Sequence, residues 1–154
     1  MAVRPLRPFN WFVQENIVQK QSPNIARAKA LFDEANRRQE ARAILLAATP
    51  IIDVLANTYL ENAYDELLAL TRAIMLAEGC VARGEGAHEA EVAYLVTIHV
   101  PETSVRLLNT LRASRNGVLY YGENASSEYA EQAVTLAQTL GPLLRAECTK
   151  RGIA

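Results

Sequence analysis

The stretch AYDELLALTRAIMLAEG, residues 63–79, decides the fold of this 154-residue chain. Its apolar residues cover more than one face of a helix, which is typical of a helix packed on several sides. Thr49-Pro50 is a start signal and Gly79 is an end signal, so a helix is predicted over residues 50–78. It is the longest helix that we predict, and we place it at the centre of the molecule or at an interface.

This helix also carries a line of polar side chains. Asn57, Glu61 and Asp65 are spaced by four residues and share one face, and Arg72 follows about two turns later. We take Glu61 and Asp65 as candidate members of a binding site.

Other helices are predicted on both sides of the central one. Ser22 as N-cap with Pro23 in the first position begins one of them. The predicted ranges are 23–48, 89–98, 103–121 and 127–150, the last with a kink at Gly141-Pro142. The run AYLVTIHV, residues 93–100, is the only β-rich one and stays ambiguous. We therefore predict an all-α, up-and-down bundle of four or five helices.

The first 21 residues are predicted to form an extended N-terminal arm, and residues 22–154 a single helical domain. Pro5 and Pro8 oppose regular helix there, while Phe9, Trp11 and Phe12 supply apolar mass that a free tail does not need. Two interpretations stay open: the arm folds onto its own domain, or it lies across a partner subunit.

Composition excludes several function classes. Two cysteines indicate no disulfide framework, which favours a reduced, cytoplasmic chain. The cysteines and histidines lack the close spacing of metal ligands, so we expect no metal. The loop CVARGEGAH, residues 80–88, lacks the GxxxxGK[ST] pattern of a phosphate loop, and we expect no cofactor. No apolar run is long enough for a membrane span, and the start has no signal-peptide core, so we expect no membrane association.

Charge is distributed unevenly along the chain. The net charge of −1 gives no general case for nucleic-acid binding. Residues 50–102 carry two basic against nine acidic residues, whereas residues 106–122 carry three arginines and no acid. A local basic strip therefore exists in a nearly neutral protein.

The order of four segments resembles a known family: AYDELLALTRAIMLAEG (63–79), GAHEAEVAYL (86–95), LRASRNGVLYYG (111–122) and SSEYAEQAVTLAQTL (126–140). Over about residues 50–145 the chain is similar to the HEPN superfamily of prokaryotic helical domains. The resemblance implies a homodimer with the arginine motif near the interface. It also implies a nucleotidyltransferase-type protein partner, as in toxin–antitoxin pairs. Many members of the family cleave RNA without metal, using an Arg followed after four to six residues by a His.

The chain departs from that motif at its catalytic end. Arg115 and Asn116 match the start, but Tyr120 and Tyr121 stand where the histidine is expected. Tyrosine has an unperturbed pKa of about 10, so only about one part in a thousand is phenolate at neutral pH. The resemblance thus implies Arg115, Asn116 and Tyr120 as the catalytic positions while removing the usual base. Tyr120 could still donate a hydrogen bond or stack on an RNA base.

Helix geometry limits how these residues meet. Arg112, Asn116 and Tyr120 lie along one stripe, whereas Arg115 and Tyr120 point about 140° apart. They meet only if Gly117 bends the helix or a second subunit contributes.

We expect at most one of Tyr120 and Tyr121 to face the same side as Asn116, and the other to be buried in the core. Arginine forks suit phosphate. Alternatively, Arg112 and Arg115 pair with acids of the central helix such as Glu61 or Asp65, and both roles can coexist.

The two histidines and a second basic run complete the candidates. His88 precedes a helix, which indicates a capping or surface role, but it would be the best replacement base if it reached Arg115 across a dimer. His99 lies in an apolar context that favours core or surface placement. Arg37, Arg38 and Arg42 indicate a solvated face that could extend an RNA-facing surface.

Three hypotheses follow for the function. The first is a cytoplasmic HEPN-like homodimer that binds RNA or a nucleotide, with weak or lost nuclease activity, as a toxin–antitoxin or defence component. The second is an active metal-independent endoribonuclease toxin, and the third is a non-catalytic scaffold whose basic strip docks an acidic protein.

Overall fold

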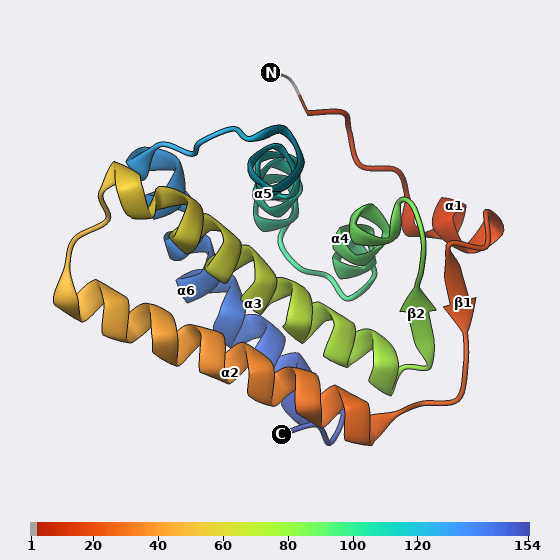
Figure 1. The fold of residues 1–154 in the computed structure, drawn as a ribbon. Coiled ribbons are helices and arrows are strands. Elements are labelled where there is room, and N and C mark those ends of the chain that lie inside the picture. The colour runs from red at the N-terminus through yellow and green to blue at the C-terminus, as the bar shows by residue number, and fades with distance from the viewer. Residues whose placement is uncertain (1–2) are drawn as a thin grey trace.

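The computed structural model describes residues 3–154, so the first two residues of the predicted arm lie outside it. Within these residues the chain forms six α-helices, a short 3-10 helix and a pair of three-residue strands (Figure 1). The order is α1 (Phe9–Gln14), β1 (Val18–Lys20), α2 (Ile25–Ala48), η1 (Asp53–Leu55), α3 (Ala56–Ala77), β2 (Cys80–Ala82), α4 (Ala87–Thr97), α5 (Glu102–Tyr121) and α6 (Ser127–Lys150). The predicted all-α bundle is confirmed.

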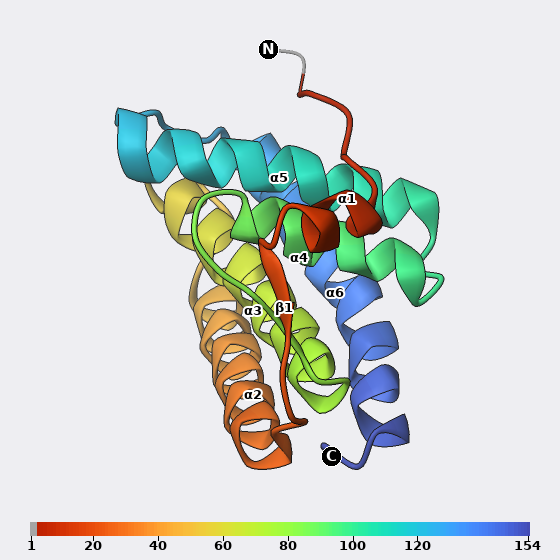
Figure 2. The same ribbon diagram turned by 90° about the vertical axis from the view of Figure 1, so that its right-hand side faces the viewer.

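Helix α3 is the centre of the molecule, as its sequence predicts. Fifteen of its 22 residues are buried, because α2 and α6 run alongside it and α4 and α5 cover its remaining side. Figure 2 shows that α5 runs across the long helices near one end of the bundle, rather than alongside them. This crossing brings residues from four helices to one region of the surface.

The N-terminal arm folds onto its own domain, which is the first of the two interpretations. Phe12 is fully buried, and β1 pairs antiparallel with β2, with Val18 opposite Ala82. Arg7 donates two side-chain hydrogen bonds to Glu89 on α4, at 3.0 and 2.9 Å. Burial alone would raise the pKa of Glu89, but hydrogen bonds from Arg7 and Arg4 lower it to about 2. The arm is thus fastened by both apolar burial and charge.

Element boundaries correct several sequence predictions. Asn24 rather than Ser22 caps α2, and its Oδ1 accepts a hydrogen bond from the Arg27 amide at 3.0 Å. The predicted loop after Gly79 begins instead with β2. Its pairing partner lies some 60 residues away in sequence, and three residues are too few to show the apolar–polar alternation that indicates a strand. Residues 50–55 were predicted as the start of the central helix, but they precede α3, and the last three of them form η1. The ambiguous run 93–100 is helical through Thr97, and α6 continues through Gly141 and Pro142.

A buried charge cluster joins the three long helices. Glu66 of α3 is fully buried and accepts hydrogen bonds from Arg42 of α2 at 2.5 Å and Arg145 of α6 at 2.8 Å. Gly141 makes room for it, because a Cβ there would lie 2.9 Å from Arg145 Nη1 and 3.4 Å from Glu66 Oε1. Gly141, where the sequence suggested a kink, therefore allows the side chains of Arg145 and Glu66 to pack closely against the backbone of α6.

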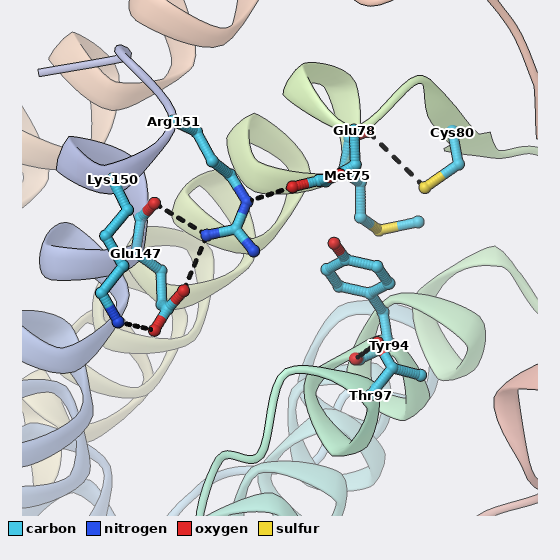
Figure 3. A network of polar contacts seen from close by, with 8 residues as sticks. All are labelled: Met75, Glu78, Cys80, Tyr94, Thr97, Glu147, Lys150 and Arg151. Atoms are coloured by element: carbon cyan, nitrogen blue, oxygen red, sulfur yellow. Dashed lines mark hydrogen bonds and ion pairs between the residues drawn. The ribbon is translucent and has the colours of Figure 1, made fainter.

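A second polar network lies at the C-terminal end of α3 (Figure 3). Arg151 donates to Glu78 at 2.6 Å and to Glu147 at 2.7 Å, which fastens the end of α6 to the end of α3. The Cys80 thiol donates to the Met75 carbonyl at 3.5 Å. Every helix within the described residues is too short or too polar to span a lipid bilayer.

Candidate functional site

A small polar cavity of about 210 Å³ lies where α2, α3, α4 and α5 come together. Three arginines and a histidine line it, together with two acids. These charged and titratable residues are Glu34 and Arg38 of α2, Asp65 and Arg72 of α3, His88 of α4, and Arg115 of α5. Arginines from α2, α3 and α5 and a histidine from α4 therefore face one cavity.

Asp65 is the acid that organises the cavity. Arg115 Nη2 donates to Asp65 Oδ1 at 3.2 Å, and Arg38 Nη1 lies 3.6 Å from Asp65 Oδ2. Arg38 also donates to Glu34 one turn earlier on α2, at 2.9 Å. The predicted pairing of Arg115 with an acid of the central helix is thus present, and the carboxylate bridges two arginines.

Arg72 is held by an acid outside the cavity lining. Its Nε donates to Glu91 Oε1 at 2.8 Å. Glu91 is 3% exposed, and burial raises its pKa above the usual range while Arg72 opposes that shift. The pair positions a guanidinium at the cavity wall.

His88 lies in the first turn of α4 and is half-buried. Burial lowers the pKa of its imidazole below 6.5, and the charges of Arg72, Arg115 and Arg112 lower it further, against the opposing charge of Asp65. A neutral imidazole at pH 7 can accept or donate one proton in a hydrogen bond. His88 and Arg115 line the same cavity within one chain, so no dimer is needed to bring them together.

Tyr64 lies beside this cluster, fully buried on α3. The guanidinium carbon of Arg115 is 5.6 Å from its ring centroid. Burial raises the pKa of its hydroxyl, as does the charge of Glu91. Among residues 3–154, the Tyr64 hydroxyl, Arg115 Nε and Glu91 Oε2 are buried without a hydrogen-bond partner. Such unpaired groups cost about 1–3 kcal/mol each when no water or ligand pairs with them.

Several predicted site residues lie elsewhere. Arg112 donates to Asn109 at 3.1 Å rather than to Glu61 or Asp65. Asn116 and Glu61 are half-buried and do not line the cavity. Of Asn57, Glu61 and Asp65 on α3, only Asp65 lines the cavity, while Asn57 accepts a hydrogen bond from the Ala125 amide at 2.8 Å and so contacts the loop before α6.

The tyrosine prediction was wrong in one respect. Tyr120 and Tyr121 are 70% and 79% exposed, so neither is core. The last turn of α5 extends past the helices beneath it (Figure 2), and Gly122, with φ of 66°, ends the helix there. No neighbouring element in the described chain covers this turn.

Sequence reasoning missed part of the cavity. Arg38 and Arg72 were noticed without being joined to Arg115, and Glu34, Tyr64 and Glu91 were not singled out. The i,i+4 spacing of Glu34 and Arg38 was a readable signal for their pairing, but their distance from Arg115 depends on helix packing.

Within the described part of the chain, no three histidine, cysteine or acidic side chains gather as metal ligands. Comparison with protein-family models, with curated proteins and with solved structures gave no match to this chain. The resemblance to HEPN domains therefore stays a prediction from the quoted segments.

Proposed function

We propose that this chain is a HEPN-like RNA- or nucleotide-binding protein that holds a phosphate group in the cavity, with weak or lost nuclease activity. The observation that carries the proposal is the convergence of Arg38, Arg72 and Arg115 with His88 on one volume. Guanidinium groups offer several donors in a planar fork, which suits phosphate oxygens. The Nε of Arg115 is buried and has no hydrogen-bond partner within residues 3–154, so it adds a donor from which a phosphate oxygen can accept.

The exposed end of α5 supports RNA or nucleotide over a simple anion. Tyr120 follows Arg115 by five residues, which is about 7.5 Å along a helix axis. Exposed aromatic rings stack on bases with little sequence preference, contributing about 1–3 kcal/mol per base. Tyr120 and Tyr121 lie about 140° and about 120° around the helix from Arg115, so an RNA longer than one nucleotide is needed to place a phosphate in the cavity and a base on either ring.

The assembly belongs to the same proposal. In line with the resemblance, the protein forms a homodimer and works with a nucleotidyltransferase-type partner as a toxin–antitoxin or defence component. Light scattering after gel filtration tests the dimer, and co-purification with the product of the neighbouring gene tests the partner.

RNA binding is tested by fluorescence anisotropy with a labelled single-stranded oligonucleotide at low salt. Arg115→Ala is expected to weaken binding at least tenfold. Arg106→Ala is the matched control, because Arg106 lies on the same helix but is exposed and paired with Glu102. Thermal unfolding establishes that both variants are folded. Equal affinity of both variants and wild type, or no binding at all, contradicts the proposal and favours an acidic protein as the partner.

The second candidate function is a metal-independent endoribonuclease, which the position of His88 favours. In that reaction the neutral imidazole takes the 2′-OH proton and the 2′-oxygen attacks phosphorus. The bond to the 5′-oxygen breaks, and that oxygen takes a proton from the imidazolium. The products are a 2′,3′-cyclic phosphate and a 5′-hydroxyl.

Incubation with RNA in EDTA separates the two candidates. Cleavage that leaves cyclic phosphate ends and disappears in both Arg115→Ala and His88→Ala supports the enzyme. Binding without cleavage supports the first candidate.

A further inference from the structure

The cations of the cavity are already occupied by carboxylates of the same chain. Asp65 contacts both Arg115 and Arg38, Glu34 holds Arg38, and Glu91 holds Arg72. An incoming anion must therefore compete with Asp65 for two guanidinium groups. This competition decides which anions can bind.

We propose that the cavity selects a phosphate monoester dianion, the terminal phosphate of an RNA end or of a mononucleotide, over the phosphodiesters inside an RNA chain. The inference rests on the proposed function and adds the class of phosphate that the site accepts.

Charge is the first reason. A phosphodiester carries one negative charge, the same as the Asp65 carboxylate that it must displace. Asp65 is fixed on α3, so it loses no translational freedom when it pairs, whereas a ligand does. A phosphodiester therefore has no electrostatic advantage to offset that cost. A monoester carries a charge of about −1.5 to −2 at pH 7 and has three terminal oxygens. Its attraction to the guanidinium groups therefore exceeds that of the Asp65 carboxylate.

Size is the second reason. The cavity of about 210 Å³ holds about seven water-sized volumes. Sites for whole small molecules are usually about 300–1,000 Å³. A terminal phosphate fits inside with its sugar and base outside, whereas an internal phosphate brings two sugars to the cavity with it.

Unpaired donors are the third reason. Arg115 lines the cavity, and its Nε is buried without a hydrogen-bond partner among residues 3–154. A group with three terminal oxygens can accept from Arg115, Arg38 and Arg72 together, which a diester with two free oxygens cannot match.

The test uses the full chain and three RNAs of one sequence, with a 5′-hydroxyl, a 5′-phosphate or a 3′-phosphate end. We expect at least one phosphorylated RNA to bind tenfold or more tightly than the unmodified one. AMP and adenosine form a second pair, in which AMP is expected to bind and adenosine is not. AMP binding as tight as that of phosphorylated RNA identifies a mononucleotide as the ligand, and weaker AMP binding identifies an RNA end.

Asp65→Asn tests the competition directly. Removing the competing charge is expected to raise the affinity for the unmodified RNA and to reduce the preference for phosphorylated ends toward one. Glu102→Gln is the matched control, because Glu102 is an exposed acid of α5 far from the cavity lining, and it should leave the preference unchanged. Arg115→Lys keeps the positive charge but removes the planar guanidinium fork. This variant is therefore expected to lose most of the preference for phosphorylated ends.

Two results overturn the inference in different ways. RNA binding that is sensitive to Arg115→Ala but indifferent to end phosphorylation contradicts the selectivity and leaves the proposed function standing. Absence of binding by every RNA, AMP and inorganic phosphate contradicts both.

Discussion

The imidazole of His88 lies half-buried beside the charges of Arg72, Arg112 and Arg115, and this placement governs how it titrates. We expect its pKa, followed by NMR, to lie below 6.5. Because the charge of Asp65 opposes the shift, Asp65→Asn should lower the pKa further, and Arg72→Gln should raise it. A His88 pKa at or above 6.5 in the wild type would contradict the arrangement of the cavity.

The same residue links stability to pH. The unfolded chain binds the His88 proton near pH 6.5, while the folded chain binds it only at lower pH, so protonation favours unfolding. The contribution of His88 to the free energy of unfolding is therefore present above pH 6.5 and lost as pH falls through the folded pKa. We expect His88→Gln to lose less stability than wild type between pH 7 and pH 5, measured by urea denaturation. Equal losses in the two proteins would refute this linkage.

Residue-level prediction from the sequence succeeded for the pairing of one arginine. The pairing of Arg115 with an acid of the central helix was one of two open alternatives, and Asp65 provides it. The exposure of both Tyr120 and Tyr121 was not predictable, since it depends on whether another element covers the end of α5.

At the scale of elements, the cluster of Glu66, Arg42 and Arg145 holds α2, α3 and α6 together. Removal of one member leaves buried charge without a partner, which typically costs about 3–5 kcal/mol. We expect Glu66→Ala to lower the free energy of unfolding by that amount, measured by urea denaturation. Glu102→Ala, which breaks an exposed pair with Arg106, should change it by no more than about 0.5 kcal/mol. Similar small effects from both variants would mean that the cluster is not a structural joint.

The arm is the second element-scale test. Phe12 is fully buried against α4 and the strands, so Phe12→Ala is expected to cost about 3–5 kcal/mol. Asn10→Ala on the exposed side of α1 should be near neutral. The comparison is made by thermal and urea unfolding. A small effect at Phe12 would show that the arm is not part of the folded domain in solution.

Elements were predictable where local signals mark them. Ser126 caps α6 by accepting from the Tyr129 amide at 3.1 Å, and a serine directly before the predicted helix 127–150 is such a start signal. The β1–β2 pair was not predictable, because three-residue strands far apart in sequence carry no periodic pattern. Asn24 replaced Ser22 as the cap of α2 because its own amide also bonds to the Leu76 carbonyl at 3.0 Å, which places it at the helix start.

For the whole molecule, composition and apolar spacing were sufficient to predict a helical bundle around residues 63–79. The cavity was not predictable, because it exists only where α5 crosses the long helices and brings Arg115 to Arg38, Arg72 and His88. Helix packing angles depend on the summed shapes of many side chains, and no single motif records them.

The charge of the whole molecule predicts how RNA binding responds to salt. For single strands, the logarithm of the binding constant falls with the logarithm of salt concentration with a slope of about −0.7 per neutralised phosphate. The net charge is −1 and Asp65, Glu34 and Glu91 already compensate the arginines of the cavity, so few counterions can be released. We expect a slope of about −1, from one or two phosphates, in anisotropy titrations between 50 and 300 mM salt. Asp65→Asn uncovers one further charge and should steepen the slope by about 0.7. A wild-type slope several times steeper would mean that RNA follows a broad basic face outside the cavity, such as the one carrying Arg37, rather than placing one phosphate in the cavity.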